Sequence, residues 1–151
     1  MLQLTRDGEY AVRAVLHLAA QPPGKLSLIQ EIAEKQEVPK SYLSKIMQNL
    51  TRAGLVKSRR GARGGFHLAM PAGEITLRQA IEAVEGPIFL NVCLIRKGEC
   101  RRDELCPIHP VWKEAQMKLF EILDGKTMAE LARDARKLEE SYYAKKAPGA
   151  G

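Results

Sequence analysis

The sequence predicts a mostly α-helical protein with one small β-hairpin and a long helix near the C-terminus. Three observations support this fold class. Of 151 residues, 45% are hydrophobic but only 5% aromatic, a balance that favours aliphatic helix packing over a β-rich fold. Apolar residues recur at helical spacing, most regularly over residues 40–53 and 107–124. Between residues 55 and 70, two strand-like segments flank a glycine-rich turn, which is the pattern of a hairpin.

Three helices are expected before the hairpin, over residues 5–20, 27–36 and 39–53. Thr5 can cap the first helix. Ser27 and Gln30 match a capping box at the start of the second, and Gly54 can close the third.

The third helix and the hairpin carry one set of polar and basic side chains. Opposite the apolar face of the helix lie hydroxyls, an amide and cations that can donate to base edges and phosphates: Ser41, Ser44, Lys45, Gln48 and Arg52. The hairpin adds Arg59, Arg60 and Arg63. A solvated helix face and a hairpin kept soluble by charge are the alternative interpretation. Together, however, the helix pair and the basic hairpin match a winged helix-turn-helix that binds double-stranded DNA.

The charge distribution supports a polyanionic ligand. Residues 1–70 contain 11 Lys and Arg against five Asp and Glu, so they hold the whole net charge of +6. Residues 71–151 contain 13 basic and 13 acidic side chains, which cancel. The excess positive charge therefore belongs to the expected DNA-binding region, residues 1–72.

The second half is expected to contain a connecting helix within 73–90, a loop over 91–109, and two helices within 107–147. Thr76 and Thr127 each begin a further capping box. The apolar stripe of the helix over 107–124 spans about 120° of arc. It can pack against its own chain, or against a second copy across a two-fold axis to form a homodimer.

Several functional classes are not indicated by any pattern in the chain. Neither a membrane-length apolar run nor a signal peptide is apparent, so no membrane association and a cytoplasmic location are expected. Nucleotide-binding glycine motifs and catalytic triad orders are not apparent either. No catalytic residue is proposed, and the chain is not expected to be an enzyme.

All three cysteines, Cys93, Cys100 and Cys106, lie in one short segment that ends at His109. Thiolates with an imidazole are the ligands of iron–sulfur clusters and of zinc. Two alternatives to a cluster remain open. The segment could hold a structural zinc ion, or the cysteines could act as bare redox thiols, with Arg101 and Arg102 stabilising the thiolate of Cys100.

The chain resembles the IscR/NsrR-type (Rrf-type) winged-helix transcription regulators over almost its whole length. The resemblance rests on short matching segments and on the three cysteines followed by histidine: Leu4-Thr5, Gly8 to Val12, Ser41 to Leu43, Gly54 to Val56, Arg60-Gly61 and Gly64-Gly65. It implies a dimer, paired through the long C-terminal helix, that binds palindromic promoter sites and senses iron–sulfur, redox or nitric oxide status through a cluster.

The resemblance also implies roles for individual residues. Cys93, Cys100 and Cys106 match the cluster ligands, and His109 matches the histidine that completes a 2Fe–2S site. Glu9 of the partner subunit is the alternative fourth ligand, and a 4Fe–4S cluster is the alternative group. Arg60 matches a wing arginine that enters DNA. Ser41, Tyr42 and Ser44 match DNA-contacting positions at the start of the recognition helix.

Overall fold

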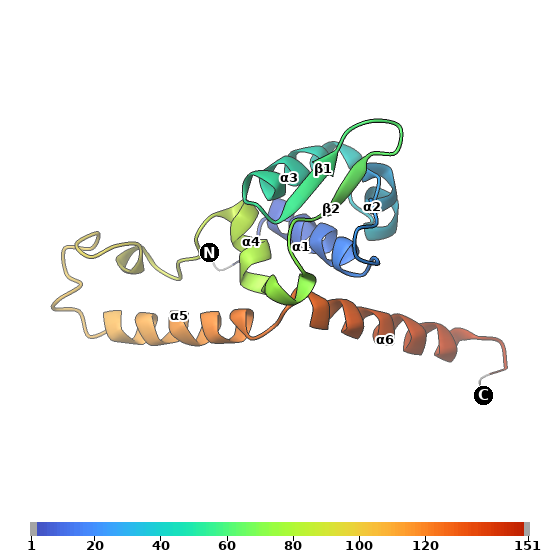
Figure 1. The fold of residues 1–151 in the computed structure, drawn as a ribbon. Helices are drawn as coiled ribbons and strands as arrows, with labels where there is room; N and C mark the ends of the chain where they lie inside the picture. Colours follow the sequence, from blue (N-terminus) through green and yellow to red (C-terminus); the bar gives the residue numbers. More distant parts are fainter. Residues whose placement is uncertain (1–2, 150–151) are drawn as a thin grey trace.

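The computed structural model describes residues 3–149, which form six α-helices and one two-stranded antiparallel sheet (Figure 1). This confirms the expected fold class. The elements in chain order are α1 (Arg6–Ala19), α2 (Ile29–Gln36), α3 (Lys40–Arg52), β1 (Val56–Arg59), β2 (Gly65–Leu68), α4 (Leu77–Glu85), α5 (His109–Asp124) and α6 (Met128–Lys146). Two short 3₁₀ helices, η1 (Ala72–Glu74) and η2 (Val92–Leu94), lie in the connections.

The core of the globular part surrounds α1, which packs against α2, α3, α4 and α6. Ala11, Ala14 and Val15 of α1 are fully buried. From α3, Leu43, Met47 and Leu50 are also fully buried. The apolar face of α3 thus fixes which side of that helix remains outside.

The hairpin is shorter than its sequence pattern suggests, and it gains a third partner. In the register of β1 and β2, Val56 lies opposite Leu68 and Arg59 opposite Gly65. Ser27 forms a bridge with Phe66, in which each backbone N–H donates to the other residue's carbonyl, at 2.9 Å and 2.8 Å. A Cβ on Gly65 would lie 2.7 Å from the carbonyl oxygen of Ser27, so this close approach requires glycine.

The Ser27 capping box is therefore a wrong prediction. Ser27 is fully buried in the bridge, and α2 begins two residues later with Leu28 as an N-cap that makes no side-chain hydrogen bond. The capping-box pattern does not distinguish a helix cap from a residue whose backbone forms hydrogen bonds with a strand distant in the sequence.

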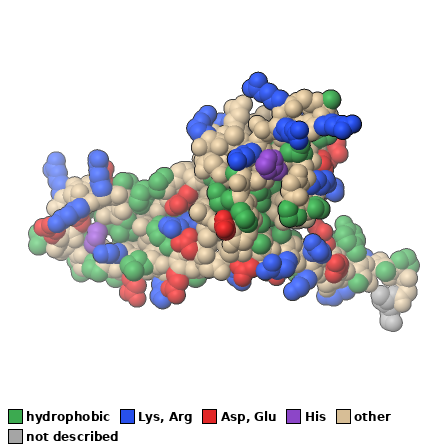
Figure 2. All heavy atoms as spheres, viewed as in Figure 1, with side chains coloured by type: hydrophobic (Ala, Val, Ile, Leu, Met, Phe, Trp, Pro, Cys, Tyr) green, Lys and Arg blue, Asp and Glu red, His purple; other side chains and the backbone are tan. Residues whose placement is uncertain are grey.

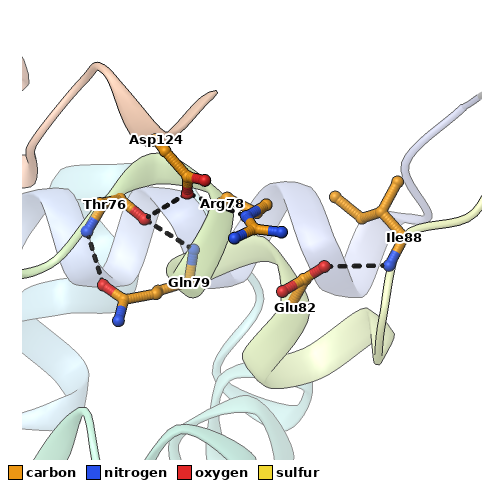
Figure 3. Close-up of polar contacts among 6 residues, drawn as sticks. All are labelled: Thr76, Arg78, Gln79, Glu82, Ile88 and Asp124. Atoms are coloured by element: carbon orange, nitrogen blue, oxygen red, sulfur yellow. Dashed lines mark hydrogen bonds and ion pairs between the residues drawn. The ribbon is translucent and has the colours of Figure 1, made fainter. Parts of the chain in front are cut away.

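The two other capping boxes are confirmed, and they meet at one junction. Thr76 and Gln79 form the box of α4, while Thr127 and Glu130 form that of α6. Thr76 and Thr127 are joined by an antiparallel bridge. Figure 3 shows Asp124, at the end of α5, beside the start of α4. Its carboxylate accepts hydrogen bonds from the Thr76 hydroxyl and, at 2.9 Å, from Nε of Arg78.

α5 and α6 extend away from the globular part in opposite directions (Figure 1). α5 begins at His109, two residues after the expected start at Pro107, and Pro110 occupies its first turn. Within the described residues, α5 has no buried residue. Its apolar stripe is therefore only partly covered by its own chain.

Candidate DNA-binding surface and cysteine loop

The polar face of α3 is open to solvent. Its six candidate DNA-contacting residues are all exposed: Ser41, Tyr42, Ser44, Lys45, Gln48 and Arg52. The hydroxyl of Ser44 donates to the Lys40 carbonyl at 3.3 Å, and a guanidinium N–H of Arg52 donates to Asn49 at 3.4 Å. Both contacts lie within the helix itself, so they leave the helix face accessible to an external ligand.

The three arginines of the hairpin, Arg59, Arg60 and Arg63, are exposed as well. They lie at the end of β1 and in the turn that joins it to β2. Figure 2 shows Lys and Arg side chains gathered over the hairpin and the neighbouring helices. α3 packs against β1 of the hairpin, and the exposed side of α3 together with the hairpin is hereafter called the basic face.

Two residues of α1 support the exposed side of α3, and sequence reasoning did not identify them. The Tyr10 ring lies edge-on to the Tyr42 ring, with centroids 6.0 Å apart. The carboxylate of Asp7 lies 3.8 Å from the Lys45 ammonium. Asp7 is expected as a first-turn acid from the helix dipole alone, and only the packing of α1 on α3 gives it a second contact.

The cysteine loop, residues 86–108, places its cysteines around one cavity. Cys93 lies in η2, and all three cysteines are free and half-buried. A cavity of about 440 Å³ is lined by residues that include Cys93, Cys100, Cys106 and His109. The four residues singled out from the sequence thus share one site, although α5, rather than the loop, carries His109.

The chemistry of these four residues fits an iron–sulfur cluster, because thiolates and an imidazole are its usual ligands. Nδ1 of His109 is buried, with no hydrogen-bond partner among residues 3–149, so the imidazole has a free ligand position. Across the same residues, however, no three His, Cys, Asp or Glu side chains are close enough to hold a metal ion. Among the described residues, the four candidate ligands thus line one cavity without forming a metal-ion site.

Glu9, the alternative fourth ligand, is exposed on α1 and pairs with Arg13 of the same helix. It points to solvent rather than into the core, so it stays available to a second molecule. Its role as a ligand from the partner subunit remains a prediction.

The exposed recognition helix, the basic hairpin and the core around α1 define a winged-helix DNA-binding protein. Residues 4–134 match the Rrf2 family, described as iron-dependent transcriptional regulators. The chain belongs to this family, which confirms the resemblance seen in the sequence.

Individual relatives agree with this assignment. The chain is 33% identical to the HTH-type transcriptional regulator IscR of Vibrio campbellii over 93% of this chain and 83% of that protein. The structure of T. potens IscR is similar with a TM-score of 0.71 and 30% identity, covering 89% and 88% of the two chains. CymR, the global cysteine regulator of B. subtilis, is similar with a TM-score of 0.68 and 28% identity, covering 88% and 98%.

These relatives are transcriptional regulators, not enzymes, in agreement with the sequence analysis. Among residues 3–149, no helix has the length and apolar character needed to cross a bilayer.

Proposed function

We propose that the protein is a dimeric regulator whose affinity for promoter DNA depends on an iron–sulfur cluster held in the cysteine loop. One observation supports this most directly: three free cysteines and His109 line a single cavity in a chain that also carries an exposed winged helix. Cys93, Cys100, Cys106 and His109 would hold the cluster, and 2Fe–2S is favoured because histidine ligation is typical of certain two-iron centres. A 4Fe–4S cluster, or Glu9 of the partner subunit as fourth ligand, is the alternative arrangement.

The bound cluster would supply sensitivity to redox state, nitric oxide or iron–sulfur supply. The thiolates and imidazole would bind the cluster, and its binding would hold the loop beside the N-terminus of α5. The His109 imidazole must be neutral to ligate.

DNA recognition is assigned to the basic face. The hydroxyls of Ser41, Tyr42 and Ser44 and the amide of Gln48 would donate to base edges and phosphates, while Lys45 and Arg52 neutralise phosphates. Arg59, Arg60 and Arg63 would contact the flanking backbone or minor groove. Two copies paired through α5 would read a palindromic promoter site in the cytoplasm, with half-sites about 34 Å apart.

The test begins with absorption spectra, and with iron and acid-labile sulfide assays, on protein purified without oxygen. We expect a coloured protein that contains iron and sulfide, and Cys93→Ala should lose the colour. DNA affinity is then measured on a duplex selected by the protein from a random pool, with cluster-loaded and cluster-free protein. The dissociation constants of the two forms should differ in the wild type, whereas Cys93→Ala should bind DNA equally before and after the same cluster-reconstitution treatment. Leu105→Ala, an exposed position in the same loop, should behave as wild type.

Identical operator binding with and without the cluster would refute cluster sensing. A colourless protein containing zinc would instead indicate a structural metal site.

A thiol-based sensor is the second candidate, because the three cysteines are free and separated in this conformation and a global cysteine regulator is among the similar structures. Reversible oxidation that changes DNA affinity in protein without iron would favour it.

A further inference from the structure

We propose that Glu85 is a positioning residue that couples the cysteine loop to the recognition helix α3 through the N-terminus of α1. The inference rests on the proposed function, since it concerns how the state of that loop alters DNA affinity. It is supported by a set of contacts that lie between the start of the cysteine loop and α3.

Glu85 caps a helix from which it is separated by 80 residues in sequence. One oxygen of its carboxylate accepts the backbone N–H of Thr5 at 3.0 Å and also the Thr5 hydroxyl proton. The Thr5 hydroxyl oxygen in turn accepts the Gly8 N–H at 3.3 Å. The first turn of a helix has N–H groups without partners inside the helix, and a negative charge there is favourable. The start of α1 is therefore stabilised by the end of α4.

Gly8 leaves the space that this contact needs. A Cβ on Gly8 would lie 2.2 Å from the Glu85 carboxylate oxygen Oε1 and 2.9 Å from its carbon Cδ. Gly8 lies inside α1 and is buried, so backbone flexibility does not explain a glycine there. The absence of a side chain explains it, because only then can the carboxylate reach Thr5.

The other end of this connection is the DNA-reading side of α3. The same first two turns of α1 carry Asp7, which lies 3.8 Å from the ammonium of Lys45, and Tyr10, which packs edge-on against Tyr42. A shift at the start of α1 therefore acts on two candidate DNA-contacting side chains.

Glu85 also lies directly before the first residue of the cysteine loop. It is the last residue of α4, and Gly86 follows with a φ of +78° where the chain turns away. Two hydrogen bonds hold the segment after Gly86. The Ile88 N–H donates to Glu82 of α4 at 3.1 Å (Figure 3), and the Leu90 N–H donates to Gln116 of α5 at 3.0 Å. Gln116 and Cys93 line one cavity. A change of the loop around Cys93 is therefore expected to reach the segment that directly follows Glu85 through the Leu90–Gln116 contact.

The test uses three variants of the full chain: Glu85→Ala, Gly8→Ala and the double variant. DNA affinity is measured on the selected duplex with cluster-loaded and cluster-free protein. The ratio of the two dissociation constants should fall to about one in both single variants. If Gly8→Ala acts through its clash with Glu85, the double variant should match Glu85→Ala. Glu140→Ala, which removes the same charge from an exposed site on α6, should keep the wild-type ratio.

A second measurement separates failure of this inference from failure of cluster sensing. Hydrogen–deuterium exchange of residues 5–13 and 40–48 is compared before and after iodoacetamide modifies the three cysteines, which perturbs the loop without a cluster. Exchange should change in the wild type and not in Glu85→Ala, with circular dichroism confirming that the variant is folded. A folded Glu85→Ala protein that retains the wild-type response in either measurement would overturn the proposal, as would a wild type whose exchange is unaffected by modification.

Discussion

His17 shows how a single buried residue makes the stability of this fold depend on pH. It is only 3% exposed on α1, and its Nε2 has no hydrogen-bond partner within the described residues. Burial lowers the pKa of His17 below its ordinary value of 6.5, and the Glu31 carboxylate, 3.8 Å away, opposes that shift only in part. Lys35 and Lys25 lower the pKa further. The folded state therefore favours the neutral imidazole.

The stability of the protein should fall as the pH drops below about 6.5, because the unfolded chain then binds a proton that folded His17 resists. The free energy of unfolding in urea, measured at about pH 7.5 and about pH 5.5, should decrease more in the wild type than in His17→Gln. His67→Gln, at a half-exposed histidine, should keep the wild-type dependence. Parallel pH profiles for wild type and His17→Gln would contradict this explanation.

At the scale of one element, α5 divides into a covered and an open side. Leu119 and Leu123 line a cavity with Phe89 and Ile81 of the same chain. Val111 and Ile122 of the same stripe remain 63% and 67% exposed. Apolar residues left exposed at helical spacing on a long helix are suited to pairing with a second copy, which is why we propose α5 as the dimer interface.

Ile122→Glu should weaken that dimer about tenfold or more, because it would bury a charge without a partner in an apolar contact. Met117→Glu is the matched control: Met117 is 63% exposed on the same helix, but at 100° per residue it points about 140° away from Ile122. Sedimentation equilibrium of both variants measures the effect. Equal dissociation constants for the two variants would exclude this face of α5 as the interface.

At the scale of the whole molecule, the net positive charge lies in a different half of the chain from the cysteine loop and α5. The half of the chain that forms the basic face holds the net charge of +6, while the cysteine loop and α5 belong to the neutral half. Figure 2 shows Asp and Glu interspersed with Lys and Arg along the lower, elongated part of the molecule. DNA is therefore expected to approach the globular part by way of the hairpin and α3.

Arg60→Ala should cost about 1–3 kcal/mol of DNA binding if the guanidinium reads a base edge. If it contacts a phosphate instead, the salt dependence of the binding constant should become shallower by about one charge. Arg136→Ala removes an exposed arginine of α6 and should change neither quantity. Fluorescence anisotropy over a salt series measures both variants. An unchanged affinity and salt dependence in Arg60→Ala would remove the wing arginine from the interface.

The sequence pattern predicted those features that depend on interactions between residues close together in the chain. The three helices before the hairpin, the capping boxes at Thr76 and Thr127, and the exposed face of α3 follow from spacing within a few residues of one another. The cysteines, which are close together in the sequence, also line one cavity in the structure.

Contacts between distant segments could be decided only by the tertiary structure. Ser27 was predicted to be a helix cap but pairs with Phe66, and the approach of Glu85 to Gly8 joins residues far apart in the sequence. The start of α5 at His109, and the spacing of the thiols around their cavity, likewise depend on how the loop packs. The sequence alone thus predicted the helices, the hairpin and the exposed side of α3, because these depend on near neighbours. The tertiary structure decided the contacts of Glu85 with Thr5 and of α1 with α3, because they join residues that only folding brings together.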